Sequence, residues 1–209
     1  MGGVPEFVRE LVHNKHRVFL DLKFYDIPNT VAKAAKQAAL LHVEMLTLHL
    51  SGGSAMIKAV LDEFAEIPHL RPKLLGVSVL TSFDDVRWAE VTKSMTGHAM
   101  KASDSVASIV EHSSTWGIDG VVCSAFELAD IRKIAPSLYT VVPGIRPSGT
   151  LSNDQARVTT PRIAREFGAH AIVVGRPITE SPHPVKVVHS ILNELSPGKE
   201  MNRELYLHP

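Results

Sequence analysis

The chain has 209 residues, with 22 basic and 22 acidic side chains and one cysteine. Its 44% hydrophobic and 21% charged residues are typical of a single globular domain. The balanced charge, without a basic block, argues against a nucleic-acid partner. The single Cys123 excludes a disulfide framework and a cysteine-rich metal centre. No signal-peptide pattern and no run of about 18 apolar residues is present, so we expect a cytoplasmic protein without membrane contact.

Strand-like and helical segments alternate along the chain. Apolar runs predict six strands, at residues 18–23, 45–49, 74–80, 120–123, 139–142 and 171–174. Helical patterns are found at residues 6–14, 30–41, 54–65, 103–115, 125–134, 161–167 and 184–195. Helix starts are indicated at Asn29 or Thr30 after Pro28, at a capping box of Ser124 with Glu127, and at Thr160 before Pro161. Such βα alternation predicts a parallel sheet.

The sheet is expected to be a (β/α)8 TIM-type barrel rather than a doubly wound sheet. Polar or glycine-bearing segments repeatedly follow the strands, and a barrel gathers such loops at one mouth. No G-x-G-x-x-G follows the first strand. A closed barrel needs eight strands and about 250 residues, whereas about six βα units are visible here, and the gap lies at the N-terminus. We expect one N-terminally truncated barrel domain at residues 1–196 and a polar tail at 197–209.

The first strand and the turn after it carry the strongest chemical signal. Residues 19–30 read FLDLKFYDIPNT. Because side chains alternate along a strand, Asp21 and Lys23 are expected to share one face, with Leu20, Leu22 and Phe24 on the other. With Asp26 following, the segment is interpreted as the rim of an active site; a structural ion pair at a strand end is the alternative.

A second signal lies in the last βα unit. Residues 173–179 read VVGRPIT, in which Gly175 permits close backbone approach and Arg176 offers a planar charged fork to phosphate. A plain turn with a surface arginine is the alternative. Before it, residues 142–157 form a long polar segment that predicts a lid, with Arg146 and Gln155 facing a phosphorylated ligand or, alternatively, solvent.

Other polar residues have ordinary explanations. Thr81 either binds a ligand or caps a following short helix, and capping suffices for Ser82. His49 is interpreted as a core histidine rather than a metal ligand, since the eleven histidines form no metal-binding motif. Cys123 lies in an apolar strand and is interpreted as packing.

Several motifs in order along the chain resemble orotidine 5′-phosphate decarboxylase of the bacterial type, from about residue 5 to residue 195. They are DLKFYDIPNT (21–30), VLTS (79–82), DGVVCS (119–124), PGIRP (143–147), DQ (154–155) and GRPIT (175–179). The resemblance implies a homodimeric nucleotide-binding barrel that converts orotidine 5′-monophosphate to uridine 5′-monophosphate and carbon dioxide in de novo pyrimidine biosynthesis. It implies no metal or organic cofactor.

The resemblance also implies roles for single residues. Lys23 would protonate C6 of the pyrimidine, Asp21 would lie beside it near the departing carboxylate, and Asp26 would reach the partner's active site. The remaining contacts with substrate would come from Ile27 and Thr30 across the dimer, Thr81 at the base, Gln155 between base and phosphate, and Arg146, Gly175 and Arg176 at the phosphate.

The chain departs from the family pattern in one main respect. An Asp and a Lys that the family normally takes from its first two strands are missing, so the chain resembles a truncated version, and we expect weak turnover or none. Tyr25 also stands where many relatives have His. The alternatives are a related sugar-phosphate lyase, epimerase or Schiff-base aldolase, and a truncated, non-catalytic paralogue that binds phosphate ligands.

Overall fold

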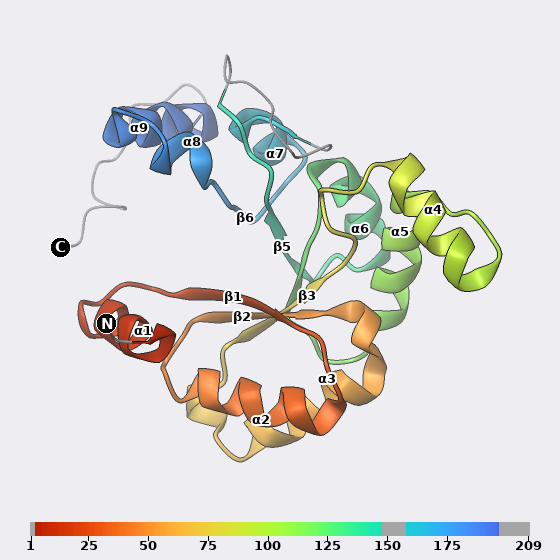
Figure 1. Cartoon of the computed structure of the whole chain (residues 1–209). Coiled ribbons are helices and arrows are strands. Elements are labelled where there is room, and N and C mark those ends of the chain that lie inside the picture. The colour runs from red at the N-terminus through yellow and green to blue at the C-terminus, as the bar shows by residue number, and fades with distance from the viewer. Residues whose placement is uncertain (1–2, 148–157, 197–209) are drawn as a thin grey trace.

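Six parallel strands curl into an open arc with helices on its outer side (Figure 1). This computed structural model describes residues 3–147 and 158–196. The strands follow one another across the sheet in chain order. They are β1 (Phe19–Phe24), β2 (Met45–His49), β3 (Lys73–Val77), β4 (Gly120–Val122), β5 (Tyr139–Val142) and β6 (Ala171–Ile172). Within the described residues β1 and β6 are the two edges of the arc, so the predicted incomplete (β/α) barrel is confirmed.

The helices alternate with the strands as predicted. They are α1 (Val4–His13), α2 (Pro28–Ala39), α3 (Gly53–Ala65), α4 (Asp85–Thr96), α5 (Ala102–Ser113), α6 (Leu128–Ile134), α7 (Pro161–Glu166), α8 (Arg176–Thr179) and α9 (Pro184–Leu195), with short 3-10 turns η1 (Leu50–Gly52), η2 (Pro68–Leu70) and η3 (Ala125–Glu127). No helix in the described ranges is both long and apolar enough to cross a bilayer. The predicted tail, 197–209, lies outside the described residues.

The main core lies between the sheet and the helices, and α2 and α3 show how the sequence forms it. The buried face of α2 is almost all alanine, at Ala32, Ala35 and Ala39, which lets α3 approach closely. From α3, side chains such as Met56 and Phe64 fill the space above the strands. This packing fixes the first two strands, and β1 carries the Asp21 and Lys23 side chains of the site.

The helix starts follow local capping chemistry in three places and differ from the prediction in two. Ser124 and Glu127 form the predicted capping box, and the Thr160 side chain accepts a hydrogen bond from the Ile163 amide. The prediction for α2 was wrong, because this helix begins at Pro28 itself, without a side-chain cap. Ser82 does not cap α4 either; Asp84, two residues on, accepts from the Arg87 amide.

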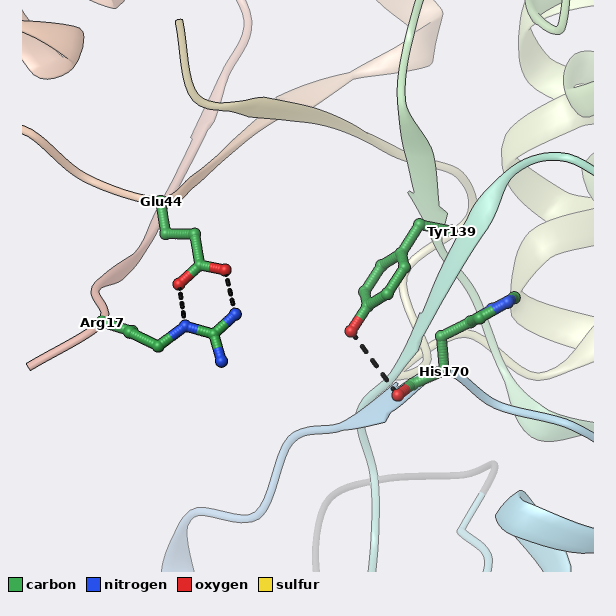
Figure 2. Close-up of polar contacts among 4 residues, drawn as sticks. All are labelled: Arg17, Glu44, Tyr139 and His170. Atoms are coloured by element: carbon green, nitrogen blue, oxygen red, sulfur yellow. Dashed lines mark hydrogen bonds and ion pairs between the residues drawn. The ribbon is translucent and has the colours of Figure 1, made fainter. Parts of the chain in front are cut away.

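The amino ends of the strands carry paired polar side chains of their own. Arg17, just before β1, binds both carboxylate oxygens of Glu44, just before β2 (Figure 2). On the other side of the arc the Tyr139 hydroxyl donates to the His170 carbonyl (Figure 2). The centroids of the two rings lie 5.0 Å apart. These contacts join neighbouring strands at the end of the sheet away from the cavity described below.

Candidate active site

The carboxyl ends of the strands surround a cavity of about 360 Å³. Its walls combine apolar strand residues with most of the polar residues that the sequence singled out. The predicted site residues that line it are Asp21, Lys23, Thr81, Arg146, Gly175 and Arg176. The cavity is lined by the ends of β1, β3 and β4 and by the loops after β5 and β6. It brings together residues up to 155 positions apart, from 21 to 176, as expected for the mouth of a barrel.

Asp21 and Lys23 form an ion pair at one side of this cavity. The Lys23 Nζ donates to Asp21 Oδ2 at 2.5 Å. Both side chains are partly accessible, at 38% for Lys23 and 40% for Asp21. The predicted common face is thus confirmed, and the pair is open to a ligand in the cavity.

The strand that carries the pair is irregular, which the sequence did not predict. Leu20 is opposite Leu46 and Phe24 is opposite Leu48, so four steps along β1 match two along β2. Lys23 has φ +48°, a left-handed conformation that is uncommon for a side chain of this size. The predicted packing of Leu22 was wrong: it is 46% exposed. The bulge interrupts the alternation that would have turned it inward.

Thr47 holds this irregular segment from the neighbouring strand. Its Oγ1 accepts the Lys23 backbone N–H at 2.9 Å and donates to Asp21 Oδ1 at 2.8 Å. Thr47 is fully buried. Sequence reasoning missed this residue, although a polar Thr on an apolar strand, on the same face as His49, was the available signal.

His49 lies at the end of β2, close to the charge pair. Burial lowers the pKa of His49, and the nearby Lys23 ammonium lowers that pKa further, while Asp21 opposes the change. Its ring lies 5.7 Å from the Tyr25 ring. Burial and the Lys23 ammonium thus both favour the neutral form of this partly buried imidazole. Within the described ranges, no group of three or more His, Cys, Asp or Glu side chains is arranged to hold a metal ion.

Arg146 lies at another part of the cavity wall. Gly144, at φ +75°, turns the chain after β5, and residues 145 and 159 form a bridge that fixes the segment. Arg146 is only 8% exposed, and its Nη1 donates to the Ile145 carbonyl at 2.9 Å. Its buried Nη2 has no hydrogen-bond partner among the described residues. A buried guanidinium with an unused donor in a cavity wall fits an anionic ligand.

Gly175 and Arg176 line the same cavity after β6. Gly175 precedes the single turn α8, and a side chain placed there would meet nothing within 4 Å. The backbone is therefore open to a ligand at this point, as the sequence predicted. Thr81, beyond β3, lies in the wall as well. Cys123 is buried, as predicted, and also lines the cavity.

Three predicted residues lie outside the cavity. Asp26, Ile27 and Thr30 are all exposed, in the turn after β1 and the first turn of α2, and Ile27 is 70% accessible. Among the described residues, the Asp26 carboxylate accepts a single hydrogen bond, from the neighbouring Ile27 amide at 2.6 Å. Gln155 lies outside the described residues, as does most of the predicted lid, residues 148–157.

A (β/α) barrel with a charged cavity at the carboxyl ends of its strands has the architecture of a barrel enzyme. Residues 2–191 match the family described as "Orotidine 5'-phosphate decarboxylase / HUMPS family". Relatives named orotidine 5'-phosphate decarboxylase include one from Sodalis glossinidius, 42% identical over 93% of this chain and 75% of its own, and one from Legionella pneumophila strain Paris, 43% identical over 91% of this chain and 82% of its own. The chain belongs to this family.

Solved structures agree with the sequence comparison. The crystal structure of orotidine 5'-phosphate decarboxylase from Lactobacillus acidophilus matches with a TM-score of 0.75 and 35% identity, over 91% of this chain and 80% of that one. An uncharacterized conserved protein from Geobacillus kaustophilus matches with the same TM-score and 30% identity, over 92% and 82% of the two chains. The fold and the family therefore agree.

Proposed function

We propose that this chain decarboxylates orotidine 5′-monophosphate to uridine 5′-monophosphate, with Lys23 as the proton donor. The observation that carries the proposal is one cavity with the Asp21–Lys23 pair in its wall and, in another part of it, the buried Arg146, whose Nη2 has no partner within the described ranges. Its volume, about 360 Å³, falls in the range of roughly 300–1,000 Å³ common for small-molecule sites. The family match supports the substrate.

Lys23 is suited to the chemistry that the reaction requires. Breaking the bond from C6 to the carboxylate releases carbon dioxide and leaves the electron pair on C6, where no adjacent group accepts it. A positioned ammonium stabilises that charge and then donates a proton to C6, after which the neutral amine takes a proton from solvent. Because the ammonium supplies both effects, we propose that no metal or organic cofactor takes part.

The ion pair also favours a proton donor over a Schiff-base lysine. A Schiff base needs a neutral amine, usually desolvated or beside another cation. Here the Lys23 Nζ contacts the Asp21 carboxylate at 2.5 Å, and its side chain is 38% exposed. This environment supports an ammonium ion, and the aldolase alternative is correspondingly disfavoured.

At the phosphate end, we propose that Arg146, Arg176 and the Gly175 backbone hold the nucleotide. The Arg146 Nη2 is buried without a partner in the described residues, and Gly175 leaves the backbone open. Phosphate binding away from the ring supplies binding energy that the enzyme can use in the transition state. Thr81, in the wall, is proposed to contact the base, and Gln155 to bridge base and phosphate.

We further propose a homodimer in which Asp26, Ile27 and Thr30 complete the partner's site. All three are exposed and lie outside the cavity of their own chain. Tyr25 and Ile27 expose apolar surface, 63% and 70% accessible, on both sides of Asp26. An exposed carboxylate between two exposed apolar side chains fits a contact between copies. A cytoplasmic location stays a prediction from the sequence.

Turnover of orotidine 5′-monophosphate, followed by its loss of absorbance, tests the proposal. We expect at most weak turnover by the chain, and what turnover there is should fall about 10³-fold or more in Lys23→Met because general acid and electrostatic effects are lost together. Lys58→Met, which removes a surface lysine paired with Asp62 on α3, is the matched control and should match the unmodified chain. Equal rates for the chain and Lys23→Met would contradict the assignment.

Thermal melting with uridine 5′-monophosphate distinguishes a binder from an enzyme. A ligand that binds only the folded chain raises the melting midpoint. A raised midpoint without turnover would favour the non-catalytic alternative. An unchanged midpoint would contradict both the decarboxylase and the non-catalytic binder.

A further inference from the structure

We infer that Thr47 is a positioning residue that holds Lys23 and Asp21 in the geometry needed for proton transfer; this inference rests on the proposed function. Thr47 does not line the cavity and is fully buried beneath it. Its hydroxyl contacts both members of the pair, the backbone N–H of Lys23 and the carboxylate of Asp21.

The first contact holds the backbone where the pairing of the two strands is irregular. Between Leu20 and Phe24 the pairing of β1 with β2 is shifted, so the backbone of this stretch does not follow a regular register. Here the Lys23 N–H donates to the Thr47 Oγ1 at 2.9 Å. This bond lies at the residue whose φ is +48°. Conformations of this kind persist when surrounding contacts enforce them, and Thr47 supplies one.

The second contact orients the carboxylate. Thr47 Oγ1 accepts from Lys23 and donates its own proton to Asp21 Oδ1, at 2.8 Å, because a carboxylate oxygen can only accept. The other oxygen, Oδ2, is then directed at the Lys23 Nζ, at 2.5 Å. One hydroxyl thus fixes the backbone of Lys23 and the side chain of its partner at once. A group of this size, buried and with both hydrogen-bonding capacities used, has little freedom to adopt another arrangement.

Substitutions of Thr47 separate positioning from simple packing. Thr47→Val keeps the shape and loses the hydroxyl, and we expect kcat to fall about 10- to 100-fold because a displacement on the order of 1 Å can cost that much. KM should stay within about threefold, since the phosphate contacts are unchanged. Thr47→Ser keeps the hydroxyl and should therefore retain most of the kcat of the unmodified chain. Thr47→Ala, which cannot clash, should lose kcat as Thr47→Val does.

Thr140→Val is the matched control. Thr140 is a buried strand threonine whose hydroxyl bonds His170 Nδ1 at 2.8 Å, away from the cavity. The same change there should lower stability and leave kcat unaltered. If Thr140→Val reduces kcat as much as Thr47→Val does, or if Thr47→Ser fails to retain activity while folded, the positioning role is wrong.

Two measurements do not depend on turnover and separate this inference from the proposed function. In the unmodified chain, the Lys23 amide should exchange slowly with deuterium, and unprotected exchange would overturn the inference. A crystal structure of Thr47→Val should show the Asp21–Lys23 pair displaced or Lys23 relaxed from positive φ. An unchanged pair would overturn the inference even if the enzyme is active. If the unmodified chain shows no turnover while the pair is displaced in Thr47→Val, only the proposed function is removed and the inference stands.

Discussion

At the amino ends of the strands, Arg17 pairs with Glu44 and Arg71 pairs with Asp119, while at the carboxyl ends Lys23 pairs with Asp21. The pairs are chemically alike, but their surroundings differ. Asp119 also accepts the Leu74 backbone N–H at 2.7 Å, so its pair connects the start of two strands. The Lys23 pair instead lines a cavity. An ion pair at a strand end is thus ambiguous by itself, and its neighbours decide its role.

The two ends also differ in unused hydrogen-bonding capacity. At the amino end, Arg71 donates to Asp119 and to the Gly117 carbonyl. At the carboxyl end, Arg146 is more deeply buried and keeps one nitrogen without a partner among the described residues. Buried polar groups are normally satisfied, so this nitrogen indicates the end of the sheet where a ligand is expected. Substitutions at the two ends should therefore have different effects.

Arg146→Met should give the largest effect. We expect KM for orotidine 5′-monophosphate to rise about 100-fold, because charge-assisted hydrogen bonds to phosphate worth roughly 3 kcal/mol are lost. Steady-state kinetics measure this change. Arg71→Met, at the amino end, is the control and should leave KM unaltered. A similar KM increase in both variants would remove the distinction between the two ends.

Mixing two inactive variants tests whether the carboxyl end is shared between copies. Each proposed site takes Lys23 from one chain and Asp26 from the other. A heterodimer of Lys23→Met and Asp26→Asn therefore has one site in which both residues are intact. Random exchange of subunits should restore about a quarter of the activity of the unmodified chain, since half the dimers then carry one such site. Activity after mixing is compared with that of each variant alone. If activity does not recover although subunits exchange, Asp26 does not contribute to the partner's active site.

Asp119→Ala should affect stability and leave catalysis intact. The change removes the acceptor of the Leu74 N–H and the partner of Arg71, and we expect a loss of about 1–3 kcal/mol in the free energy of unfolding. Urea unfolding measures the loss, and kcat at a temperature where the variant is folded should equal that of the unmodified chain. A large fall in kcat with normal stability would contradict a structural role.

Glu44→Gln should give the smallest effect, and one that depends on pH. The hydrogen bond from Arg17 lowers the pKa of Glu44, so the folded state favours its ionised form. The stabilisation is present above the ordinary pKa of a glutamate and is lost as pH falls through the lower, folded-state pKa. Unfolding free energies of the two proteins should therefore differ at pH 7 and converge in acid. A difference that grows in acid would have the wrong sign.

The sequence predicted the carboxyl end well where a short pattern defines the geometry. Alternation along β1 was enough to place Asp21 and Lys23 on one face, and the order of strands was enough to bring Arg146 and Arg176 to the same mouth. These predictions rely on the period of a strand and on the parallel barrel, which both follow from local pattern.

The details that the sequence missed depend on contacts between strands. The bulge in β1 and the exposure of Leu22 arise from its pairing with β2, which no single strand encodes. Thr47 gained its role only because that bulge leaves the Lys23 N–H facing it. Helix α4 was expected only as a short helix; it buries Thr92 alone, so its pattern of apolar residues is weak.

A crystal structure of the chain with uridine 5′-monophosphate tests the central claim most directly. We expect the phosphate at Arg146, Gly175 and Arg176, and C6 of the pyrimidine about 3–3.5 Å from the Lys23 Nζ, close enough for proton transfer. A nucleotide bound in this cavity with its ring away from Lys23, or bound at the amino ends of the strands, would contradict the account.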